Sequence, residues 1–134
     1  MTRLLAPNPG EVADRSTILE LKIAFAEKHN SPAEHFHEEL SDLNLYLGEK
    51  WSKDYEKLRQ DMLKVNQKLW YAEDEIRAVR KKGDTSSLEA IEKLAGLAVI
   101  ITEQNDVRSN LVRQINELFG ITAQEKLYTC ATTK

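Results

Sequence analysis

Seven apolar side chains recur between positions 58 and 79 at alternating intervals of four and three residues. They are Leu58, Met62, Val65, Leu69, Ala72, Ile76 and Val79. This spacing puts them on one face of an α-helix of about six turns, and no glycine or proline interrupts the segment. A helix with one long apolar face has to bury that face against other elements. Lys82 and Gly83 then supply a cation followed by glycine, as expected at a helix C-terminus.

A first helix is predicted from Pro9 to about His29. Asn8 can cap its N-terminus, Pro9 suits the first helical position, and Glu11 lies where the acid of a capping box belongs. Its apolar residues fall on two stripes. One stripe holds Val12, Leu19, Ile23 and Ala26, and the other holds Ile18, Leu21 and Phe25.

Two more helices follow from the same kinds of signal. Ser31 as a cap and Pro32 at the first position predict a second helix, which Gly48 is expected to end. The capping-box sequence at 86–89 predicts a long fourth helix towards Phe119. Its apolar stripe is expected to hold Ile91, Leu94, Ala98 and Ile101, and then Leu111, Val112, Ile115 and Leu118. A short last helix is predicted over about 122–128.

These elements predict an all-α protein, an antiparallel bundle of about four main helices with a short C-terminal helix. The chain has 134 residues with five glycines and three prolines. Such a length suits one domain, 1–134, with an ordered core over about 9–128. Two of the helices are expected to exceed 25 residues, and a homodimer is one way to cover the apolar surface that extends past the core.

A second stripe on the third helix mixes polar and apolar residues. Leu63 and Trp70 indicate that the stripe is partly buried, yet it also carries Asn66, Glu73 and Arg77. Glu73 and Arg77 are four residues apart, which suits a helical ion pair. Two interpretations remain open: a surface ion pair beside an amide, or one wall of a polar cavity.

The fourth helix is polar in its middle, over residues 104–108. Asn105 and Arg108 fall in phase with Ile101 and Val112, so they point where core residues are expected. An arginine on an inward stripe needs an acidic partner or an anionic ligand. The alternative is a kinked or solvent-exposed midsection.

Acidic residues suggest a possible metal site. Glu11 and Asp14 are three residues apart on one face, and together with Glu73 or Asp74 they have the ligand type that divalent cations such as Mg²⁺ or Mn²⁺ prefer. The alternative is that the two first-helix acids simply favour the positive end of the helix dipole.

Charge and composition exclude several classes of protein. The formal net charge is −3 and the pI is about 5.7, which argues against nucleic acid as a partner. Cys130 is the only cysteine, so no disulfide forms within the chain, and a reducing compartment, the cytoplasm, is expected. No apolar run is long enough for a membrane span.

Four blocks in order resemble a small family of bacterial and phage proteins of unknown function. The blocks are residues 10–22, 66–77, 105–108 with Ile115 and Asn116, and 125–128. Domains of that family also occur in larger chains, some of which resemble sugar-transfer or repeat proteins. Its recurring polar positions correspond to Glu11, Asp14, Lys22, Asn66, Glu73, Asp74, Arg77, Asn105, Asp106, Arg108 and Lys126. The resemblance therefore implies a shared polar centre without naming its ligand.

These observations favour a small-ligand binding domain over two other hypotheses, and they leave open whether the protein is an enzyme. The first hypothesis is a site for an anionic ligand such as a nucleotide or nucleotide-sugar. Its residues are Lys22, Asn66, Trp70, Glu73, Arg77, Asn105, Asp106, Arg108 and Lys126. The second is a protein-interaction or adaptor bundle whose polar network is structural. The third is a metal-dependent hydrolase that uses the four acids named above.

Overall fold

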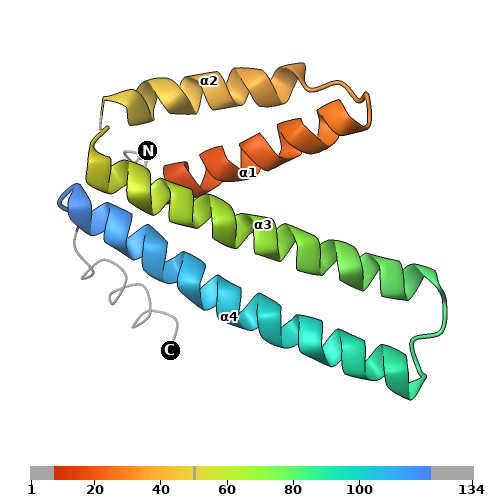
Figure 1. Ribbon diagram of the computed structural model, residues 1–134. Coiled ribbons are helices and arrows are strands. Elements are labelled where there is room, and N and C mark those ends of the chain that lie inside the picture. Colours follow the sequence, from red (N-terminus) through yellow and green to blue (C-terminus); the bar gives the residue numbers. More distant parts are fainter. Residues whose placement is uncertain (1–7, 50, 122–134) are drawn as a thin grey trace, which may run out of the picture.

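The computed structural model describes residues 8–49 and 51–121, which form four α-helices and no strand. They are α1 (Pro9–Lys28), α2 (Glu34–Gly48), α3 (Lys53–Lys81) and α4 (Leu88–Leu118). Each runs antiparallel to the one before it (Figure 1). The predicted all-α bundle is confirmed, as are the two long helices, with 29 residues in α3 and 31 in α4. The C-terminal helix predicted at 122–128 lies outside the described residues.

The predicted start of α1 is confirmed, but the predicted start of α2 is wrong. The Asn8 side chain accepts a hydrogen bond from the Glu11 backbone N–H at 3.1 Å. α2 begins only at Glu34, without a side-chain cap. The Ser31 N–H instead donates to the carbonyl of Ala26 at 2.8 Å, so Ser31 belongs to the C-terminal cap of α1.

α1 is the central helix of the bundle, because it packs against each of the other three. Among the described helices, α1 is the only one whose backbone lies close to that of α2. The first turn of α1 lies tightly on the end of α4. The Gly10 N–H donates to Asn116 Oδ1 at 2.7 Å. A Cβ at Gly10 would lie 2.3 Å from the Val112 carbonyl oxygen, so only glycine allows this approach.

The buried core joins all four helices. It contains Ala13, Leu47, Tyr55, Met62, Val65, Leu69, Leu111 and Ile115. The apolar seam predicted on α3 is confirmed, since its members are buried or half-buried. The stripe predicted on the first half of α4 is wrong in part, because Leu97 is the buried residue while Ile91 and Ala98 are exposed. This segment is apolar on all sides, so spacing alone does not select the inward face.

α3 and α4 form a hairpin that extends well beyond α1 and α2 towards the turn at Gly83 (Figure 1). At 1.5 Å per residue the two long helices span about 45 Å and α1 about 30 Å. Figure 1 also shows α1 diverging from α3 towards its C-terminal end. None of the described helices is long and apolar enough to cross a bilayer.

Candidate functional site

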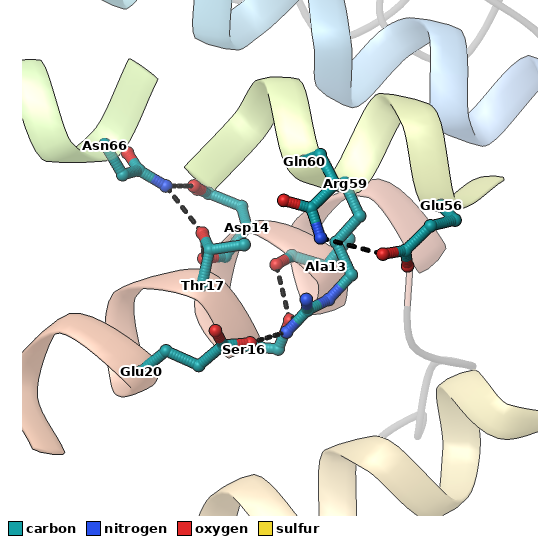
Figure 2. Close-up of polar contacts among 9 residues, drawn as sticks. All are labelled: Ala13, Asp14, Ser16, Thr17, Glu20, Glu56, Arg59, Gln60 and Asn66. Atoms are coloured by element: carbon teal, nitrogen blue, oxygen red, sulfur yellow. Dashed lines mark hydrogen bonds and ion pairs between the residues drawn. The ribbon is translucent and has the colours of Figure 1, made fainter. Parts of the chain in front are cut away.

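A hydrogen-bonded network joins α1 to α3 near the middle of the bundle (Figure 2). Asn66 is only 4% exposed. Its Nδ2 donates to Asp14 Oδ1 at 2.7 Å and to Thr17 Oγ1 at 2.8 Å, while the Thr17 hydroxyl donates to the Asp14 carbonyl oxygen. Both Asn66 donor protons are therefore used, and the orientation of the amide is fixed with its oxygen turned away from α1 as an acceptor.

Arg108 of α4 extends this network to a third helix. Its Nε lies 3.7 Å from Asp14 Oδ2. Asp14 thus receives a hydrogen bond from Asn66 on one oxygen and faces a guanidinium with the other. Of the two partners expected for this arginine, an acid or an anionic ligand, the structure shows an acid, Asp14.

A cavity of about 380 Å³ opens beside this network, where α1 diverges from the α3–α4 hairpin. We call it the three-helix pocket. It is lined by Ile18, Leu21, Lys22, Asn66, Leu69, Trp70, Glu73, Arg77, Asn105 and Arg108. Its walls combine four apolar side chains with six polar or charged ones, and its volume is near the lower end of the range for small-ligand sites. Phe25 packs against Trp70, with ring centroids 5.7 Å apart.

Each of the three helices contributes one cation to the three-helix pocket: Lys22, Arg77 and Arg108. Arg77 is 70% exposed and pairs with Asp74 at 3.0 Å and with Glu73 at 3.8 Å. The predicted ion pair with Glu73 is therefore present, although Asp74 is closer. Lys22 Nζ lies 5.6 Å from the centre of the Phe36 ring, and it makes no ion pair with any described residue.

The structure brings most of the predicted ligand-binding residues together in one place. Those that line the pocket are Lys22, Asn66, Trp70, Glu73, Arg77, Asn105 and Arg108. Asp106 is exposed and does not line it. Lys126 lies outside the described residues.

The four acids considered for a metal do not form a site in the part of the chain that the structure describes. There, no group of three His, Cys, Asp or Glu side chains is arranged to hold an ion. Asp14 is engaged by Asn66 and Arg108, Asp74 pairs with Arg77, and Glu11 is exposed on the first turn of α1. A carboxylate already neutralised by arginine is a poor starting point for a divalent cation.

A second polar contact between α1 and α3 was not anticipated from the sequence (Figure 2). The side chain of Arg59 is only 14% exposed; its Nε donates to Ser16 Oγ at 3.2 Å, and its Nη2 pairs with Glu20. A signal existed, since Arg59 lies four residues before Leu63 and so extends the mixed stripe of α3 by one step.

Tyr55 lies in the core beside this contact. Its hydroxyl is buried and has no hydrogen-bond partner among the described residues. Burial raises the pKa of Tyr55 to about 12, because the charged phenolate is disfavoured away from water.

Comparison of the chain with family models, with curated proteins and with solved structures gives no significant match.

Proposed function

We propose that the three-helix pocket binds a small anionic ligand, such as a nucleotide or nucleotide-sugar. The observation that carries this proposal is the convergence of three cations from three helices, Lys22, Arg77 and Arg108, on one cavity. A structural role alone does not require this arrangement. Surface ion pairs contribute little to stability, and Lys22 makes none with the described residues.

The pairing of the cations suggests how an anion is accommodated. Lys22 is available without breaking an ion pair within the described chain. Arg108 is separated from Asp14 by 3.7 Å, longer than a direct charge-assisted hydrogen bond, so its donors remain free for a ligand oxygen. Arg77 lies at the exposed rim, where water screens its ion pair with Asp74. Arg77 can therefore leave Asp74 and bind a ligand oxygen.

Asn66 and Trp70 suit the uncharged part of such a ligand, while Glu73 is paired with Arg77 at 3.8 Å. Asn66 offers a fixed acceptor oxygen, which matches a hydroxyl or amino group and not the anion itself. Trp70 supplies an aromatic surface on which a base or sugar ring can stack. Because 380 Å³ is near the lower limit for ligand sites, a nucleoside monophosphate or sugar phosphate fits better than a full nucleotide-sugar.

The test is a thermal-shift panel of nucleotides, nucleotide-sugars and sugar phosphates on the purified chain. A ligand at about 100 times its Kd stabilises the folded state by about 2.7 kcal/mol, which raises Tm by several degrees. Lys22→Met should weaken the shift without lowering the Tm of the free protein. Lys28→Met is the matched control, because Lys28 is the other lysine of α1, is exposed and lies outside the pocket. A panel without any hit contradicts the proposal.

We also propose membership of the bacterial and phage family that the sequence resembles, and a cytoplasmic location. Every residue that lines the three-helix pocket belongs to one of three resembling blocks, 10–22, 66–77 and 105–108. The location rests on the single cysteine. The adaptor hypothesis keeps one specific observation in its favour, the exposed apolar surface on the first half of α4.

A further inference from the structure

The first half of α4 carries an uncovered apolar seam. Its members are the apolar residues Leu88, Ile91, Ala95 and Ala98, continued by Thr102, whose hydroxyl donates to the Ala98 carbonyl oxygen at 3.0 Å, with Val99 beside them. We call this set the outer seam. The members repeat at alternating intervals of three and four residues, the spacing of a helix-packing seam. All of them are exposed in the described structure.

The other side of the same segment is also apolar. Leu97 is buried, and Leu94 and Ile101 are half-buried. A helix that is apolar on both sides is expected to be covered on both sides. α3 is the only described helix that accompanies this part of α4, because the hairpin extends beyond α1 and α2 (Figure 1). The outer seam is therefore available for another helix.

We propose that a second copy of this chain covers the outer seam, so that two α3–α4 hairpins pair antiparallel into a four-helix bundle. A two-fold axis requires one surface to complement itself, and the outer seam does so when centred on Ala95. Ile91 of one copy then lies opposite Val99 of the other, Leu88 lies opposite Thr102, and Ala98 lies opposite Glu92. The small side chains at the centre allow the two α4 helices to approach closely.

The charges at the two ends of the outer seam favour this partner. Arg80, Lys81 and Lys82 are exposed near the hairpin turn, and Glu103 and Asp106 are exposed just past the other end of the seam. None of these five makes an ion pair with another described residue. In the antiparallel pairing, Glu103 and Asp106 of each copy lie beside the hairpin turn of the other, where three cations outnumber one acid, Asp84. Such complementarity selects partner and orientation.

The mass of the full chain in solution tests the proposal, and it does so independently of any ligand in the pocket. Sedimentation equilibrium should give twice the 15.3 kDa of one chain. Ile91→Glu should raise the dimer Kd by about a hundredfold or more, since a carboxylate would be buried unpaired in each copy. Ile100→Glu is the matched control: it is the same change on the same helix at similar exposure, 41% against 50%, but off the outer seam.

A second arm tests orientation. Replacing Glu103 and Asp106 with lysine should weaken the dimer, and adding Lys81→Glu and Lys82→Glu should restore it. A monomeric wild type at high micromolar concentration overturns the proposal. So does equal weakening by Ile91→Glu and Ile100→Glu in variants that keep their helical signal. Failure of the charge exchange to restore the dimer overturns the antiparallel pairing.

Discussion

Replacing Gly10 with alanine tests the contact that fixes α1 on α4. The added methyl would lie 2.3 Å from the Val112 carbonyl oxygen and 2.8 Å from its Cγ1. The Val112 carbonyl oxygen cannot move away on its own, because it is part of the α4 backbone. α1 must therefore shift, which also strains the hydrogen bond from the Gly10 N–H to Asn116 Oδ1.

The expected cost follows from two contributions. Overpacking of this kind costs about 1–3 kcal/mol, and a weakened hydrogen bond adds up to about 1 kcal/mol. The better helix propensity of alanine offsets up to about 1 kcal/mol. We expect Gly10→Ala to lower the free energy of unfolding by about 1–3 kcal/mol. Gly96→Ala is the matched control: a Cβ there meets nothing within 4 Å, so it should stabilise by about 0.5–1 kcal/mol.

Urea unfolding followed by circular dichroism measures both changes. With an m-value of about 1–3 kcal/mol per molar, Gly10→Ala should lower the midpoint by roughly one molar and Gly96→Ala should raise it slightly. All variants are compared at one protein concentration, because self-association changes apparent stability. A Gly10→Ala midpoint at or above that of the wild type refutes the tight docking of α1 on α4.

Four further substitutions probe the buried and exposed polar groups. Asn66→Asp places a second carboxylate beside Asp14 and removes the hydrogen bond from Asn66 Nδ2 to Asp14 Oδ1, so in urea unfolding at pH 7 it should cost about 2–3 kcal/mol. Arg59→Ala should cost about 2–3 kcal/mol, because it leaves the half-buried Glu20 without its ion-pair partner. Arg15→Ala removes only the exposed ion pair with Glu39, so it should cost at most about 1 kcal/mol. Tyr55→Phe should leave stability nearly unchanged at pH 7. The pKa of Tyr55 is about 12 in the folded protein, and the ordinary pKa of tyrosine is about 10. As the pH rises from about 10 to about 12, the free energy of unfolding of the wild type should therefore fall relative to that of Tyr55→Phe.

The fold could be predicted where the sequence pattern allowed only one face of a helix to be the buried one. The seam of α3 has polar residues on most of its other positions, so its spacing identified the buried face. The first half of α4 offered apolar residues in every direction, and only packing against α3 selected Leu97. Ser31 and Pro32 form a cap signature, but a backbone hydrogen bond from Ser31 to α1 takes precedence.

Helix phase predicted only part of the candidate site. Asn105 and Arg108 interrupt an apolar stripe, so their inward direction was readable from the sequence. Helix phase cannot give the distance between helices, so the choice of Asp14 as the partner of Arg108 came only with the structure. Arg59 was missed because a single arginine resembles an ordinary surface residue, although it continues the mixed stripe of α3.

The most direct test of the three-helix pocket is an NMR titration of the two tryptophan side chains. The chain has two tryptophans, of which Trp70 lines the pocket and Trp51 does not. On addition of a nucleoside monophosphate or sugar phosphate, the indole N–H signal of Trp70 should shift saturably while that of Trp51 stays in place, and Lys22→Met should weaken the response. If the panel of anionic ligands leaves Trp70 unmoved, or shifts Trp51 alone, the pocket is not the site of an anionic ligand.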